Sequence, residues 1–187
     1  MRYLLLSTLV LLLSISGNAF AQSPYFPLEK GRVQVFRYSE TFSQGNPDLR
    51  VTMKTLEETE RIDGEDYFIV ETSAMGVTTS GFLREGKNGG VISRENAESS
   101  DHLFLDAPYE VGKSWQQALQ AQVATATIID TRATLKVSDQ TYTDCLVVET
   151  VGTEYTLRTY FQKDIGMVAN GMVVEGQEMI MMYLIEP

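Results

Sequence analysis

Apolar and polar residues alternate with a period of two along most of the chain. In segments 49–54 and 132–137, every second residue is apolar and the residues between are polar. This alternation is typical of β-strands that bury one face and expose the other. Long apolar stripes with helical spacing are scarce, so the pattern predicts an all-β protein.

Turn-forming residues separate the alternating segments. Asn-Gly and Asp-Gly pairs tolerate the positive φ angles of tight hairpins and therefore favour neighbouring antiparallel strands. We expect about ten antiparallel strands, mostly a meander, in one curved sheet that forms a half-barrel or an open barrel. The predicted turns are Gly45-Asn46-Pro47-Asp48, Asp63-Gly64, Asn88-Gly89-Gly90, Ser138-Asp139-Gln140 and Gly176-Gln177-Glu178.

Segment 114–124 admits two interpretations. It is rich in helix formers, begins with Ser114 as a possible N-cap, and places Trp115 and Leu119 at helical spacing. The corresponding stretch of the first half, 32–38, has a strand pattern. We therefore favour a strand over a helix.

A heptapeptide occurs twice in the chain. Asp66–Thr72 returns 78 residues later as Asp144–Thr150, with four identical positions, and 81–85 matches 159–163 at the same offset. We interpret the chain as two tandem related β halves, about 25–105 and 106–187. A half of about 80 residues is only marginally stable alone, so we expect one shared core. The continuous apolar run predicts a strand buried on both sides.

The first residues have the parts of an export signal. Cationic Arg2 precedes an apolar stretch, 3–15, and a small-residue end that predicts cleavage after Ala21. The mature chain, 22–187, then forms a single domain in the periplasm or outside the cell. The apolar stretch is too short for a membrane span, and Gln22 stands where a lipid-anchoring cysteine would be required. We expect no transmembrane segment in the mature chain.

Charge argues against one class of partner, and the cysteine content argues against a disulfide. The predicted leader holds one of the 15 basic residues and none of the 25 acidic ones, which leaves the mature chain with a formal net charge of −11. Because nucleic-acid binding depends on cationic contacts to phosphates, we expect no nucleic-acid partner. Cys145 is the single cysteine and lies in a Leu/Val run, so we expect a buried thiol without a disulfide.

The sequence contains no convincing catalytic set. His102 is the only histidine and follows Ser99-Ser100-Asp101, but adjacent residues seldom form a nucleophile, base and orienting acid. We interpret 99–102 as a polar loop joining the two halves. The acidic segment 57–66 lacks calcium-loop spacing and is interpreted as a solvated hairpin tip. No metal ligand or cofactor is predicted.

Methionines gather at the C-terminal end, where five of the eight lie in the last 21 residues. Met179, Met181 and Tyr183 are expected on one face of a terminal strand. Three interpretations stay open: core filling, which we favour, an apolar groove, and a Cu(I) site. Trp115 is expected to pack over one end of the sheet, with its N–H bonded to a carbonyl; a ligand platform is the alternative.

Four blocks of the chain belong together as turn and strand signatures: Pro27-Leu28-x-x-Gly31, Pro108-x-x-x-Gly112-x-x-Trp115, Asp144-Cys145-Leu146-x-Val148-Glu149 and Tyr160-Phe161-x-x-Asp164-Ile165-Gly166-Met167-Val168. They resemble the TapB-like family, exported bacterial β proteins without established activity. The resemblance covers most of the mature chain and implies a strongly curved antiparallel sheet without catalytic residues. Half-barrel lipoprotein carriers of the LolA and LolB type are a more distant analogy in architecture.

These observations lead to a hypothesis about function. The chain is interpreted as an uncharacterised, non-enzymatic envelope protein whose concave face binds an apolar ligand, a lipid or acyl chain, or a partner's segment. The ligand-binding residues predicted for it are Trp115, Met179, Met181 and Tyr183. An assembly or interaction protein of the cell surface, acting through sheet edges or loops, is the alternative, and a hydrolase at His102 is a third class. The oligomeric state is left open.

Overall fold

The computed structural model describes residues 22–43, 45–46, 48–119 and 122–187, and the predicted export signal lies outside them. Twelve antiparallel strands of these residues form one sheet. No helix among them is long and apolar enough to cross a membrane. The strands are β1 (Val33–Tyr38), β2 (Arg50–Ile62), β3 (Glu65–Ala74), β4 (Val77–Glu85), β5 (Val91–Arg94), β6 (His102–Leu105), β7 (Ser114–Leu119), β8 (Gln122–Val137), β9 (Gln140–Val151), β10 (Thr156–Gln162), β11 (Gly166–Val174) and β12 (Gln177–Glu186), with a 3₁₀ turn η1 (Lys87–Gly89) before β5.

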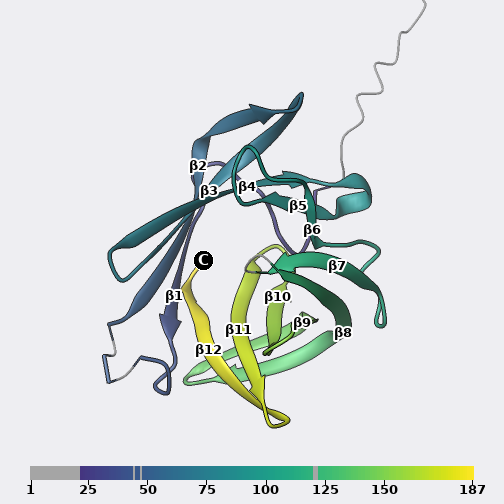
Figure 1. Ribbon diagram of the computed structural model, residues 1–187. Coiled ribbons are helices and arrows are strands. Elements are labelled where there is room, and N and C mark those ends of the chain that lie inside the picture. The colour runs from purple at the N-terminus through teal and green to yellow at the C-terminus, as the bar shows by residue number, and fades with distance from the viewer. Residues whose placement is uncertain (1–21, 44, 47, 120–121) are drawn as a thin grey trace, which may run out of the picture.

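The sheet consists of two six-stranded meanders joined edge to edge. β1 to β6 form the first, β7 to β12 form the second, and antiparallel pairing of β1 with β12 makes the sheet continuous. Figure 1 shows the meanders as two arcs, the purple-to-teal strands above and the green-to-yellow strands below. β6 and β7 are the two ends of the sheet and lie beside each other without a described ladder between them. The result is a nearly closed barrel with one seam.

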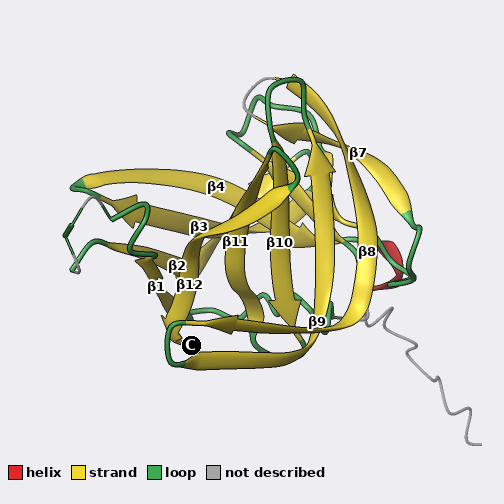
Figure 2. Cartoon of the chain, turned by 90° about the horizontal axis from the view of Figure 1, so that it is seen from below, coloured by secondary structure: helices red, strands yellow, loops and turns green. Residues whose placement is uncertain are grey.

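The predicted fold class is confirmed, whereas the strand number is wrong. The all-β class and the curved antiparallel meander were expected, but there are twelve described strands rather than about ten. β5 and β6 have only four residues each, which is too short for a recognisable alternation. Segment 114–119 is strand β7, as favoured over a helix, and pairs with β8 (Figure 2).

The hairpin turns contain residues with positive φ angles. Asp63 and Gly64 join β2 to β3 with φ angles of 53° and 88°, as their sequence predicts. The hairpin between β3 and β4 was missed. It turns at Met75, with φ of 50°, and Gly76, and a methionine in that conformation gives no turn pattern in the sequence.

The interior holds two clusters of buried side chains. On β9, Cys145 and Val147 belong to one cluster and Leu146 and Val148 to the other, because successive side chains of a strand point to opposite faces. The prediction of a strand buried on both sides is therefore confirmed for β9. The tyrosine core contains Phe36, Val51, Leu135, Tyr142, Cys145, Val147, Tyr160, Val168, Ala169, Tyr183 and Leu184, and the phenylalanine core contains Phe26, Leu28, Val91, Leu105, Trp115, Ala126, Ile128, Leu146, Val148 and Phe161.

The repeated heptapeptides lie on β3 and β9, the third strand of each meander. Their burial differs. In β3 only Tyr67 and Val70 are buried, whereas β9 buries four consecutive residues of the repeat. Duplication of a β half stays a prediction.

Candidate functional site

The four predicted ligand-binding residues do not form one site, and a β-bulge on β12 is the first reason. Met182 pairs with Asn170 of β11 and Ile180 pairs with Gly171, which leaves Met181 as the extra residue of the bulge. A bulge reverses the alternation of side chains beyond it. The sequence alone gives no indication of this shift.

The bulge separates residues that were expected on one face. Tyr183 shares its face with Ile180, whereas Met179 shares the opposite face with Met182. The prediction that Met179, Met181 and Tyr183 line one surface is therefore wrong.

Burial is the second reason. Tyr183 is 4% exposed in the tyrosine core, and Trp115 is 6% exposed in the phenylalanine core. Trp115 is buried in the interior, but its Nε1–H has no hydrogen-bond partner among the described residues, so the predicted bond to a carbonyl is wrong. Tyr183 and Trp115 fill cores rather than line an apolar ligand site.

The structure places an apolar groove elsewhere, across β2 to β6. This β2–β6 groove has a volume of about 520 Å³. Residues paired across neighbouring strands share a face, and Val70 of β3 faces the groove together with its partner Gly81 of β4. Its apolar lining comes from several strands and the N-terminal segment: Phe26, Met53, Val70, Phe82, Leu83, Phe104 and Met167.

Small residues keep the floor of the groove hollow. Gly81 has no side chain, and Thr72, Thr79 and Ser93 beside it are short. A Cβ atom at Gly81 would meet only the carbonyl oxygen of Arg94, at 3.6 Å, and φ of Gly81 is not in the left-handed region. The backbone therefore accepts a side chain at Gly81, which would occupy the groove.

Phe26 and Phe104 line one wall of the groove, and the buried Phe161 packs behind them. The ring of Phe26 packs edge-on against Phe104 with centroids 5.1 Å apart, and Phe161 lies 6.2 Å from Phe26 and 6.1 Å from Phe104. Edge-to-face packing at these separations is favourable. The three rings join the N-terminal segment, β6 of the first meander and β10 of the second.

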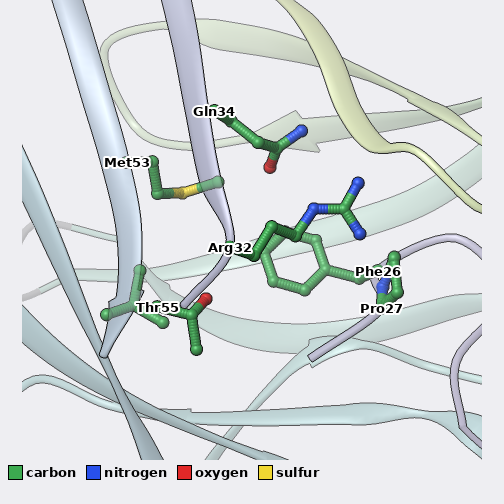
Figure 3. A pocket seen from close by; sticks show the side chains of 7 residues that line it. Phe26, Pro27, Arg32, Gln34, Met53 and Thr55 are labelled. Carbon is green, nitrogen blue, oxygen red and sulfur yellow. The ribbon is translucent and has the colours of Figure 1, made fainter. Parts of the chain in front are cut away.

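A small polar pocket continues from the groove, sharing Phe26, Met53 and Val70 with it (Figure 3). Gln34 is 3% exposed and donates from Nε2 to the carbonyl oxygens of Ile165, at 3.1 Å, and Met167, at 3.4 Å. These bonds hold the start of β11, and with it the Met167 side chain, against β1.

Arg32 lines the same small pocket. It donates from Nη2 to the carbonyl oxygen of Ile165 at 2.5 Å and lies 3.7 Å from the carboxylate of Glu29. In Figure 3 its guanidinium points toward the Gln34 amide. Since these contacts of Arg32 are to groups of the protein itself, we interpret it as a structural closure of the pocket.

A network centred on Asp101 holds the strands that carry the groove. Tyr67 donates to Asp101 at 2.6 Å, Arg84 at 2.7 Å and Arg94 at 2.5 Å, and Arg94 also pairs with Asp63 at 2.8 Å. Both guanidinium groups lie over the Tyr67 ring, 5.5 and 5.3 Å from its centre. The network ties β3, β4 and β5 to the loop before β6.

The charge state of Asp101 follows from these contacts. Burial by itself opposes ionisation, but the hydrogen bonds from Arg94, Tyr67 and Arg84 outweigh burial and lower the pKa of Asp101 to about 2. The carboxylate is therefore ionised at neutral pH and fully engaged by these donors.

The same contacts argue against a hydrolase at His102. Asp101 is bound by arginines and a tyrosine, so it does not serve as the orienting acid of a triad. His102 also begins β6 and is not in the connection between the two meanders, so that part of the loop prediction is wrong. The described residues contain no group of three or more metal-ligating side chains.

Comparison with known proteins gives only remote likenesses. No family model matches the sequence, and no curated protein matches it, so the TapB-like resemblance stays a prediction. A Bacteroides fragilis protein, described as a predicted exported protein with a YmcC-like fold, is 11% identical, with 87% of this chain and 97% of that chain covered and a TM-score of 0.49. A predicted lipoprotein from Parabacteroides distasonis is 12% identical, with 88% and 97% covered and a TM-score of 0.45. Neither likeness carries a functional inference for this chain.

Proposed function

We propose that the protein is a non-enzymatic binding protein of the cell envelope that holds a single acyl chain in the β2–β6 groove. The observation that carries this proposal is the apolar groove of about 520 Å³. Its volume falls within the range of about 300–1,000 Å³ that is usual for small-molecule sites. The envelope location rests on the export signal that the sequence predicts for its first 21 residues.

The chemistry of the lining favours an acyl chain as the occupant. Met53 and Met167 bring flexible thioethers from different meanders, and such side chains adapt to an unbranched hydrocarbon. The guanidinium of Arg94, at the groove, is already bound to Asp101 and Asp63, so the site offers mainly apolar contact. Burial of hydrocarbon would supply the binding free energy.

The decisive experiment fills the groove. Gly81→Leu introduces a side chain into the floor, where the backbone has room for it. Thr78→Leu is the matched control, because Thr78 is exposed on β4 and its side chain points to the opposite face from that of Gly81. Binding of palmitate to each purified mature protein is measured by isothermal titration calorimetry, and bound lipid is measured by mass spectrometry of solvent extracts.

The expected result separates the two variants. The wild-type protein and Thr78→Leu bind palmitate alike, and Gly81→Leu binds at least about tenfold more weakly, which corresponds to about 1.4 kcal/mol. Circular dichroism checks that both variants are folded. Absence of extracted lipid together with absence of palmitate binding by the wild-type protein would refute the proposal, as would unchanged binding by folded Gly81→Leu.

A second candidate is an assembly protein that acts through sheet edges. The observation in its favour is that β6 and β7 end the sheet without a described ladder between them. Open edges can accept a partner's strand. This function does not need the groove, so Gly81→Leu would leave the binding of such a partner unchanged.

A further inference from the structure

A second hollow lies away from the β2–β6 groove, between the end of β1 and the tip of the β8–β9 hairpin. This Arg37 cleft has a volume of about 660 Å³ and shares no described lining residue with the groove. Tyr183 of β12 and Ser138 of the hairpin turn lie on it, and Tyr142 of the hairpin donates to the carbonyl of Leu184 beside it. Figure 2 shows the hairpin extending to the end of β12.

Arg37 is the unusual residue of this cleft. Its Nε is buried, and among the described residues it has no hydrogen-bond partner and no carboxylate within ion-pair distance of its guanidinium. In a chain with 25 acidic and 15 basic residues, carboxylate partners are abundant. A buried donor without a partner costs free energy, so it marks a place where an acceptor from outside would be stabilising.

Two neighbours add to the positive and donor character of the cleft. Arg50 of β2 pairs directly opposite Arg37, so two like charges share one face of the sheet, an arrangement that is unfavourable without a counter-charge. Ser39 follows two residues after Arg37 along the chain, and its buried Oγ also lacks a hydrogen-bond partner in the part of the chain that the structure describes. Glu40 is the acidic residue on the described lining, and it is exposed.

The remaining lining is aromatic and aliphatic. Tyr38, Val137 and Tyr183 border the same space as the unpartnered groups of Arg37 and Ser39. A ligand that fits must therefore combine an anionic group with a small apolar body. Guanidinium pairs well with carboxylate and phosphate because its planar fork matches two acceptor oxygens.

We propose that the Arg37 cleft binds a small anionic molecule, with its carboxylate or phosphate group on Arg37 and Ser39 and its apolar part against Tyr38 and Val137. The site is independent of the acyl chain proposed for the β2–β6 groove. Its occupant supplies the counter-charge for Arg37 and Arg50.

The test uses matched probes. Binding of benzoate, phenyl phosphate and neutral benzamide to the mature protein is followed by amide chemical shifts at constant ionic strength. Benzoate and benzamide have the same ring and differ in charge, so their comparison isolates the anion. Comparison of the affinities for phenyl phosphate and benzoate shows which anionic group the cleft prefers.

The test variant is Arg37→Gln and its control is Arg132→Gln. Arg132 is a residue of β8 that does not line the cleft, so the control removes the same charge from the molecule. We expect an anionic probe to bind at least about tenfold more tightly than benzamide, and Arg37→Gln to lose at least about tenfold in affinity while Arg132→Gln retains it. Amides of Ser39 and Ser138 should shift on binding.

Three results would overturn the proposal. They are equal affinity for benzoate and benzamide, unchanged anion binding by folded Arg37→Gln, and no binding of either anionic probe up to about 10 mM, the weak end of the usual affinity range. Gly81→Leu should bind the anionic probes as the wild-type protein does. Failure of the acyl-chain proposal is therefore distinguishable from failure of this one.

Discussion

Asp101→Asn tests whether the arginine network holds the groove strands together. The substitution keeps the size of the side chain but removes the charge that Arg84 and Arg94 contact at 2.7 and 2.5 Å. It also replaces one acceptor oxygen by an NH₂ donor that faces guanidinium groups. Tyr67, which is fully buried, keeps at most one acceptor at this position.

The expected loss in the free energy of unfolding follows from the pKa of Asp101. Its lowering from 3.8 to about 2 corresponds to about 2 kcal/mol at about 1.4 kcal/mol per pKa unit. One third of the Asp101 side chain is exposed, so solvent screening reduces this to about 1 kcal/mol. The NH₂ donor introduced by the substitution is misplaced among other donors and adds a cost of about 1 kcal/mol. We expect Asp101→Asn to lower the free energy of unfolding by about 2 kcal/mol at neutral pH.

The pH dependence gives a sharper measurement. Because the pKa of Asp101 is lowered in the folded state, its stabilisation is complete above about pH 4 and is lost as the pH falls through about 2. Urea unfolding of the wild-type protein and the variant is compared at about pH 7 and about pH 2.5. The difference between the two proteins should shrink by about 1 kcal/mol at the lower pH.

Asp66→Asn, a substitution on β3, is the control for Asp101→Asn. Asp66 is 67% exposed and lies 3.8 Å from Arg61, a surface pair whose loss should change stability by less than about 0.5 kcal/mol. Equal effects of the two substitutions would refute the reasoning. So would a difference between wild type and Asp101→Asn that is independent of pH.

Three further predictions concern the tyrosine core. Burial, together with Asp144, raises the pKa of Cys145 to about 11, so a thiol reagent at about pH 8 should modify Cys145 only after unfolding in urea; rapid modification of the folded protein would contradict this. Tyr142→Phe removes the donor to the carbonyl of Leu184 and should lower the free energy of unfolding by about 1–2 kcal/mol in urea titrations. Burial raises the pKa of Tyr142 to about 12, so its phenol should remain protonated when spectra are recorded at about pH 11.

The groove and the cleft are assembled from distant parts of the chain. Phe26, Met53 and Met167 meet at the groove, although more than 100 residues separate the last two. Arg37 and Ser138 meet at the cleft because the β8–β9 hairpin packs beside β12. Neither site has a local motif, since their residues become neighbours only through the pairing of β1 with β12 and the folding of the hairpin.

Local chemistry allowed several features to be predicted from the sequence. The period of two determined the all-β class, and Asp63-Gly64 predicted its hairpin because these residues tolerate positive φ. The apolar run at 145–148 predicted a strand buried on both faces, since each of its residues must avoid water. Each of these predictions depends on residues close together in the chain.

The tertiary structure alone decided the candidate sites. Met179 and Tyr183 alternate correctly in the sequence, yet the bulge at Met181 turns them to opposite faces. Trp115 and Tyr183, which were predicted to bind a ligand, are buried in the two cores. Gly81 and Arg37 belong to the candidate sites because of the residues from other strands that line the groove and the cleft with them. Register between strands and packing between meanders are set by contacts across the whole sheet, and a sequence pattern of a few residues does not contain that information.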